Sequence, residues 1–122
     1  MWHGPRFSSS SSQSDTTYQP FYQDLYNANA DLILVGHMHN YERFAPQTAT
    51  GVLDNTRGIR QFVVGDGGRA LVPFTSVMPN SQVRDAATFG VMQLTLHANS
   101  YDWKFLPIAG STFTDSGTQA CH

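Results

Sequence analysis

The sequence predicts an α/β (α+β) domain, in which a helix precedes a set of short strands. Two observations carry this prediction: apolar residues recur every three or four positions in the segment 18–26, and several later apolar runs have the length of strands and end in glycine or a polar turn. The chain has 122 residues, which suits one hydrophobic core. We therefore expect residues 1–122 to form a single domain.

The helix is predicted after Asp15 and Thr16, either of which has a side chain able to cap it. Its apolar face consists of Tyr18, Phe21, Tyr22, Leu25 and Tyr26. We expect this aromatic face to pack into the core rather than to form a stacking platform for a ligand. Before the helix, the serine-rich stretch Ser8–Ser14 is polar and of low complexity, and it predicts a flexible loop.

The strands are predicted from apolar runs bounded by turn residues. The first run ends at Gly36, and the last two flank a hairpin turn at residues 97–100. The tail from Gly110 onward is small and polar, and it predicts no regular element. The predicted strands are Leu32–Val35, Ile59–Val64, Phe89–Leu96 and Tyr101–Pro107.

Composition argues against several classes of function. Charged residues make up 13% of the chain, the net charge is −2, and the seven basic residues are scattered, so we expect neither nucleic-acid nor membrane-surface binding. The residues that follow Met1 lack the pattern of a signal peptide.

Cys121 is the single cysteine, which excludes an internal disulfide and a cysteine-based zinc site. It is either an idle thiol or a partner for a cysteine of a longer polypeptide.

His37 and His39 lie two residues apart, directly after a predicted strand and Gly36. In extended backbone such residues point the same way, so both imidazoles are expected to face one site. Imidazole nitrogens bind zinc at about 2.0–2.1 Å, and a short turn presents two of them at low entropic cost. For an isolated pair of this kind, two surface histidines are the alternative interpretation.

The context of this pair favours metal binding. The segment resembles the Gly-His-x-His-x-Tyr-Glu-Arg signature of purple acid phosphatases and other calcineurin-like metallophosphoesterases, and it reads Gly36-His37-Met38-His39-Asn40-Tyr41-Glu42-Arg43. Upstream, residues Trp2–Phe7 are similar to the Trp-His-x-Pro segment of the same family. Downstream, Gly58–Gly65 and Thr88–Val91 resemble its final strands. The resemblance extends over essentially the whole chain.

The resemblance implies the C-terminal half of a metallophosphoesterase-type β-sandwich flanked by helices. It makes His3 and His37 ligands of one metal and His39 a ligand of a second, with His37 and His39 as the catalytic positions. The ions are expected to be divalent or trivalent Zn, Fe or Mn, which activate a water that attacks a small-molecule phosphate ester. The resemblance also implies an extracytoplasmic or secreted protein. Arg6 is a candidate contact for a phosphate oxygen, with a solvated charge as the alternative.

The remaining metal ligands of the family come from its N-terminal half, and no aspartate of this chain stands in the corresponding motifs. A second hypothesis is therefore a non-catalytic metal-binding or structural half-domain, which forms a homo-oligomer or complements a missing N-terminal half. A third is a single-metal remnant with weak hydrolysis of activated esters. We expect Glu42 and Arg43 to hold the histidine loop by hydrogen bonds. The turn Gly65–Arg69 is expected to reverse the chain, with a phosphate cradle as the alternative.

Overall fold

A computed structural model describes residues 1–10 and 15–122. The short 3₁₀ helix η1 (Thr16–Tyr18) leads into the helix α1 (Gln19–Asn27). The strands that follow are β1 (Leu32–Val35), β2 (Tyr41–Phe44), β3 (Arg60–Val64), β4 (Ser81–Asp85), β5 (Gly90–Leu96), β6 (Ser100–Pro107) and β7 (Ser116–Ala120). No helix in these described ranges is long and apolar enough to cross a membrane.

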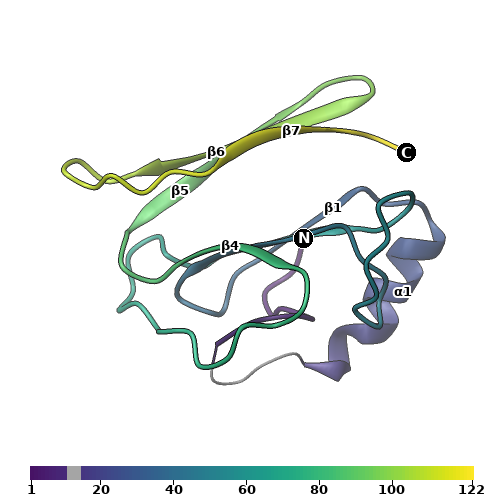
Figure 1. Ribbon diagram of the computed structural model, residues 1–122, viewed down its shortest axis with the longest axis horizontal. Helices are drawn as coiled ribbons and strands as arrows, with labels where there is room; N and C mark the ends of the chain where they lie inside the picture. The colour runs from purple at the N-terminus through teal and green to yellow at the C-terminus, as the bar shows by residue number, and fades with distance from the viewer. Residues whose placement is uncertain (11–14) are drawn as a thin grey trace.

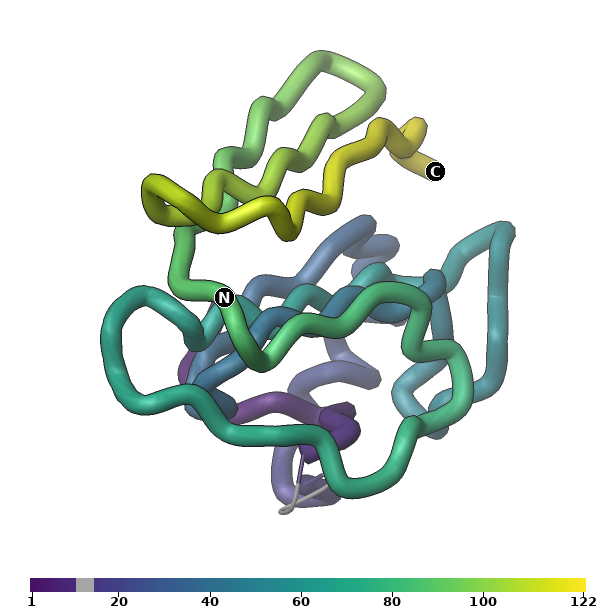
Figure 2. Tube along the Cα trace, turned by 60° about the vertical axis from the view of Figure 1, so that its left-hand side comes forward, coloured from purple at the N-terminus to yellow at the C-terminus, as the bar shows by residue number. Residues whose placement is uncertain are grey.

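The strands form two sheets, which stack as layers with α1 on the outer face of the larger one (Figure 1). The four-stranded sheet has the order β1-β3-β2-β4. In it β1 runs parallel to β3, with Leu34 opposite Phe62, and the other pairs are antiparallel. The second sheet, β5-β6-β7, is antiparallel. Figure 2 shows it as a separate layer above the rest of the chain. The mixed two-sheet architecture confirms the predicted fold class.

The predicted helix is present, but its aromatic face is only partly buried. The Asp15 carboxylate caps η1 by accepting a hydrogen bond from the backbone N–H of Thr17. Tyr22 is fully buried, and its hydroxyl donates to the carbonyl of Ile59 across 2.8 Å. Phe21, in contrast, is 60% exposed. Asn29 has a positive φ of 56°, a left-handed conformation that asparagine tolerates and that ends the helical segment.

Two apolar clusters form the core. The first lies between α1 and the four-stranded sheet and contains Phe7, Tyr22, Ile33, Val35, Met38, Phe44, Ala49, Ile59 and Val63. The second lies between the two sheets and contains Tyr41, Phe62, Tyr101, Trp103 and Phe105. Because the four-stranded sheet is covered on both faces, Phe62 and Val63, which are neighbours in β3, both have no exposed surface.

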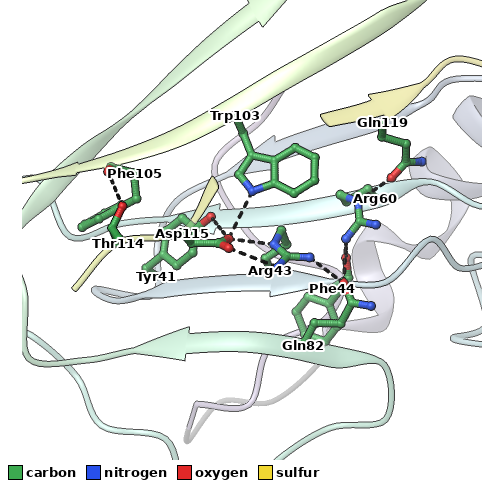
Figure 3. A network of polar contacts seen from close by, with 10 residues as sticks. All are labelled: Tyr41, Arg43, Phe44, Arg60, Gln82, Trp103, Phe105, Thr114, Asp115 and Gln119. Atoms are coloured by element: carbon green, nitrogen blue, oxygen red, sulfur yellow. Dashed lines mark hydrogen bonds and ion pairs between the residues drawn. The ribbon is translucent and has the colours of Figure 1, made fainter. Parts of the chain in front are cut away.

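A buried carboxylate joins the two sheets (Figure 3). Asp115, just before β7, accepts hydrogen bonds from the Tyr41 hydroxyl at 2.8 Å, the Arg43 Nε at 2.7 Å and the Trp103 indole at 3.2 Å. Burial and the neighbouring Asp115 raise the pKa of Tyr41, which keeps its hydroxyl protonated as a donor. We call Asp115, Tyr41, Arg43 and Trp103 the inter-sheet clasp. It fixes the second sheet on the strand that follows the histidines.

The strand predictions are confirmed with small changes in their ends, and the hairpin between β5 and β6 lies at the predicted turn. Three strands went unpredicted. The structure shows β2 inside the segment assigned to the histidine loop, β4 in a mixed polar stretch, and β7 in the tail that was expected to lack regular structure.

The prediction of a flexible serine loop is wrong for its first part. Ser8, Ser9 and Ser10 have no exposed surface. The backbone N–H and the hydroxyl of Ser9 both donate to the Glu42 carboxylate. Buried polar groups need such partners, so composition alone misled here. Residues 11–14 of that prediction lie outside the described residues.

Candidate functional site

The histidine segment begins where β1 ends. Gly36 follows Val35, and its backbone N–H donates to the carbonyl of His3 across 3.0 Å. This bond places the N-terminal segment beside the end of β1. The carboxyl ends of strands are where α/β sheets usually carry their ligands, and the histidines lie in the loop at this edge.

The structure brings His3 and His37 together. The Nε2 atom of His3 lies 3.0 Å from the Nδ1 atom of His37, and the two rings meet edge to face with centroids 4.9 Å apart. When two nitrogens bind the same ion at about 2.0–2.1 Å and the angle at the ion is near 90–110°, the nitrogens are roughly 3.0–3.4 Å apart. The observed separation therefore fits two imidazole ligands of one metal, as well as a hydrogen bond between them. The ring nitrogens of His3 and His37 are therefore suitable donors for the Zn, Fe or Mn ion that the family resemblance implies.

His37 does not have the extended backbone expected from the sequence. Its φ is 64°, in the left-handed region. This conformation costs a non-glycine residue about 1–2 kcal/mol. Such strain persists only where the surrounding structure holds the residue in place, and it is most common at functional sites. The simple alternation of residues i and i+2 therefore does not orient this pair, and the left-handed turn at His37 directs its ring to His3 instead.

His39 has different surroundings from His37. Its Nδ1 lies 3.0 Å from the carbonyl oxygen of Ala70, so the neutral ring carries its proton on Nδ1 and donates it there. Nε2 then keeps its lone pair, the arrangement typical of metal-ligating histidines. Within residues 1–10 and 15–122, no group of three or more His, Cys, Asp or Glu side chains is arranged to hold a metal. The structure thus pairs His3 with His37 and leaves His39 apart; the ligand assignments stay predictions.

Arg6 is not the solvated charge of the alternative interpretation. It is 6% exposed, its Nε donates to the carbonyl of Ala49 at 3.2 Å, and its Nη2 donates to Gln19 Oε1 at 2.9 Å. Its guanidinium also lies over the ring of Phe7, 4.5 Å from the centroid. A substrate contact by Arg6 stays a prediction.

Glu42 and Arg43 make structural hydrogen bonds, but to other segments than the histidine loop. The Glu42 carboxylate accepts from Ser9 and from the Ser81 hydroxyl, whereas Arg43 donates to Asp115 and Gln82. Because Glu42 and Arg43 are neighbours in β2, their side chains point to opposite faces of the sheet, Glu42 to the N-terminal segment and Arg43 to the second sheet. The prediction that they hold the histidine loop is therefore wrong.

Asn40 holds the loop instead, a residue that sequence reasoning missed. It is fully buried, and its Nδ2 donates to the Ser10 hydroxyl at 2.6 Å and to the carbonyl of Val72 at 3.0 Å. The backbone carbonyl of Asn40 accepts a hydrogen bond from the N–H of Gly65 at 3.1 Å. These bonds tie the loop to three segments distant in sequence. The available signal was its position directly after His39, where a small amide is well placed to bond backbone groups.

Asp66 is a second residue that the sequence did not single out. It has no exposed surface, and neither of its carboxyl oxygens has a hydrogen-bond partner in the described part of the chain. Burial, with a smaller contribution from the negative charge of Asp85, raises the pKa of Asp66 from 3.8 to about 6. An acidic group enclosed in this turn would repel a phosphate, which favours chain reversal over a phosphate cradle. Between glycines, an aspartate reads as an exposed turn residue, so no sequence signal marked it as buried.

The raised pKa of Asp66 predicts that the stability of the protein depends on pH in an unusual way. Its pKa is higher in the folded state, so the folded protein binds the proton more tightly and the cost of burial grows as pH rises from 3.8 through about 6. We expect Asp66→Asn to raise the free energy of unfolding at about pH 7.5 by about 1–2 kcal/mol, allowing for solvent screening, and to change it little near pH 3.5. Urea unfolding of both proteins across this range measures the difference, and parallel pH profiles would contradict it.

Comparison with known proteins identifies others that share this architecture. No protein-family model matches the chain. A curated relative, "Probable inactive purple acid phosphatase 24" of Arabidopsis thaliana, is 38% identical in an alignment of 79 residues that covers 57% of this chain and 13% of the relative. The structure of purple acid phosphatase PPD1 from yellow lupin (Lupinus luteus) seeds matches with a TM-score of 0.76 and 24% identity, over 93% of this chain and 23% of the lupin protein.

The chain therefore spans less than a quarter of the length of these two proteins, at 13% and 23%. Nearly all of it superposes on one part of the lupin structure, including the two-sheet arrangement. It has a purple acid phosphatase-like, calcineurin-like fold, of which it spans a part.

Proposed function

We propose that this chain supplies part of the metal site of a metal-dependent phosphoesterase that hydrolyses small-molecule phosphate esters. One observation carries the proposal: His37 adopts a strained left-handed backbone, and its ring nitrogen meets that of His3 at 3.0 Å. The strained backbone and the convergence of two imidazoles on one point support this proposal, because both features suit a pair of metal ligands. A bound Zn, Fe or Mn ion would supply Lewis acidity and lower the pKa of a water that attacks phosphorus.

The chain's own residues define how such a site is held. His3 and His37 would hold one ion through their facing ring nitrogens, and His39 would hold a second through Nε2, while its contact with the Ala70 carbonyl fixes the tautomer. Protonated imidazole has no lone pair for a metal, so binding weakens in acid. In this proposal Arg6 contacts the phosphate with N–H groups other than the Nε and Nη2 donors used by Ala49 and Gln19. An extracytoplasmic or secreted location, suggested by the family resemblance, belongs to the same proposal.

A second function has its own support. Within the described residues β1 pairs only with β3, so its other edge is open, and an apolar cavity of about 250 Å³ lies beside it, lined by residues that include Trp2, Leu34 and Val35. The curated relative carries the words "probable inactive" in its name. These observations support a non-catalytic metal-binding or structural half-domain, which would cover this edge by self-association or by complementing an N-terminal half.

Hydrolysis of a chromogenic phosphate ester separates the two functions. The chain is assayed with added zinc, manganese or iron, beside a variant that combines His37→Ala with His39→Ala. We expect the double variant to lose metal-dependent turnover, because two of the proposed ligands are gone. The control is His97→Ala, which removes a half-exposed histidine paired with Asp102 on the second sheet. Equal rates in the native and double-variant proteins would exclude the catalytic function.

A further inference from the structure

Tyr18 lies against the residue that follows His3. It ends η1, and its backbone N–H donates to the carbonyl of Asp15 at 3.2 Å. Its ring covers the buried Gly4, because a Cβ atom at Gly4 would overlap the Cε2, Cζ and hydroxyl oxygen atoms of Tyr18. The close approach of the ring therefore requires glycine at this position. The hydroxyl end of Tyr18 lies beside the backbone that carries His3.

Trp2 fixes the Tyr18 ring in this position. The two rings stack, with their centroids 6.3 Å apart and their planes inclined by 15°. The indole N–H of Trp2 donates to the carbonyl of Gly4 at 2.6 Å, so Trp2 is itself tied to the residue that Tyr18 covers. Trp2 and Gly4 are the two neighbours of His3 in the sequence. The Tyr18 side chain is thus packed against both residues that flank the proposed ligand.

The segment that ends in Tyr18 also lies near His37. The pKa of the Asp15 carboxyl is lowered, first by hydrogen bonds from Thr17 and in smaller part by nearby charges that include His37. Because electrostatic interactions weaken with distance, this contribution places Asp15 close to the His37 ring. The residues 15–18 therefore flank both histidines of the proposed ligand pair.

The hydroxyl of Tyr18 is an unused donor. No hydrogen bond within residues 1–10 and 15–122 engages it, in contrast to the hydroxyl of Tyr22, which donates to the carbonyl of Ile59. Tyr18 is half-buried, and its hydroxyl remains accessible to a ligand. The enclosed side-chain atoms without a partner in the described ranges belong instead to Asn40, Gln47, Asp66 and Tyr101.

We propose that the Tyr18 hydroxyl donates a hydrogen bond to the phosphate group of the ester bound at the site of His3 and His37. This inference rests on the proposed function, since it needs an ion at that site to hold the phosphate. A charged phosphate oxygen accepts strongly from a tyrosine hydroxyl. A donor that is already fixed by packing loses little conformational freedom when the ligand binds. The competing role for Tyr18 is packing alone, for which the ring suffices without the hydroxyl.

Tyr18→Phe tests this role, because it keeps the ring against Gly4 and Trp2 and removes the hydroxyl alone. Isothermal titration calorimetry first measures the zinc affinity of the metal-free 122-residue chain. The zinc-loaded chain is then titrated with inorganic phosphate and followed by phosphorus NMR. We expect unchanged zinc affinity and about tenfold weaker phosphate binding, equivalent to about 1.4 kcal/mol. Equal phosphate affinity in the native chain and Tyr18→Phe would overturn the proposal.

Tyr26→Phe is the matched control, since it removes another tyrosine hydroxyl from the same part of the chain. That hydroxyl donates to Asp54 at 2.6 Å, close to the beginning of β3, whereas the histidine segment follows the end of β1. Because β1 and β3 are parallel, the two positions lie at opposite edges of the sheet. We expect Tyr26→Phe to bind phosphate as the native chain does, and an equal loss in both variants would contradict a specific role for Tyr18.

Gly4→Ala gives a second test from the other side of the contact. Its methyl group must displace the Tyr18 side chain, so phosphate binding should weaken here as well. Combining it with Tyr18→Phe should cause little further loss, because both changes remove the same hydrogen bond. Native phosphate affinity in Gly4→Ala would contradict the proposal.

The zinc titration separates this inference from the proposed function. A native chain that binds no zinc would overturn both together. Normal zinc binding with equal phosphate affinities would overturn the role of Tyr18 alone. Weaker zinc binding in Tyr18→Phe would also overturn it, because the hydroxyl would then act on the metal site and not on the phosphate.

Discussion

Asp115→Ala is expected to lower the free energy of unfolding by about 3–5 kcal/mol, the usual cost of removing one partner from a buried ion pair. Asp115 is 8% exposed and accepts hydrogen bonds from three side chains, of which Tyr41 and Arg43 belong to the first sheet and Trp103 to the second. The variant leaves the guanidinium and the hydroxyl of the first sheet without their acceptor at the interface. Urea unfolding followed by tryptophan fluorescence measures the loss, and Trp103 reports directly on the contact.

The control for this prediction is Asp102→Ala. Asp102 also pairs with a basic side chain, His97 at 2.8 Å, but about half of each side chain is exposed, at 48% and 47%. Exposed pairs contribute little, so this variant should unfold nearly as wild type does. Hydrogen exchange should also differ, with Asp115→Ala losing protection in β5–β7 before the first sheet. Equal stability of the two variants would contradict the role given to the inter-sheet clasp.

Gly65→Ala is expected to destabilise the protein by about 1–3 kcal/mol and to displace the histidine loop. A Cβ atom at Gly65 would lie 1.9 Å from the carbonyl oxygen of Met38 and 3.4 Å from the Cα of His39. Both atoms are backbone, so rotation of a side chain cannot relieve the clash. The hydrogen bond from the Gly65 N–H to the Asn40 carbonyl would have to lengthen as well. Metal affinity should therefore fall together with stability.

Gly67→Ala is the matched control for Gly65→Ala, since a Cβ at Gly67 meets nothing within 4 Å. The two substitutions add the same methyl group two residues apart in one turn, and only the first touches the histidine loop. Unfolding curves and the imidazole NMR signals of His37 and His39 give the comparison. Similar behaviour of both variants would show that the close packing of Gly65 against the loop has no consequence.

Much of the fold could be predicted from the sequence because its signals are local. The spacing of Tyr22 and Leu25, the cap at Asp15 and the apolar run ending at Gly36 each act through near neighbours, and the corresponding elements are present. The strand β7 could not be predicted, because Ser116–Ala120 forms a strand by pairing with β6 and not by its own propensity. The burial of Ser8–Ser10 could not be predicted for the same reason, because the Glu42 carboxylate that accepts from Ser9 lies 33 residues away in the sequence.

The candidate site was predicted as a set of residues, but not as a geometry. His3 and His37 were assigned to one ion from the family resemblance, and the structure places their ring nitrogens 3.0 Å apart. Alternation in extended backbone predicted a common direction for His37 and His39, and the positive φ of His37 removes the basis of that argument. A left-handed turn at a histidine has no reliable sequence signal, because it depends on the packing around it. Asn40 and Asp66 escaped notice since their roles depend on burial, which composition does not reveal.

We propose that His3 and His37 bind one metal ion. Isothermal titration calorimetry of the metal-free chain with zinc measures this binding in the native protein, in His3→Ala, in His37→Ala and in His97→Ala. We expect loss of either His3 or His37 to weaken binding at least as much as the roughly 10–100-fold that removal of an outer-shell partner costs, with His97→Ala unchanged. Native zinc affinity in both His3→Ala and His37→Ala would contradict the claim.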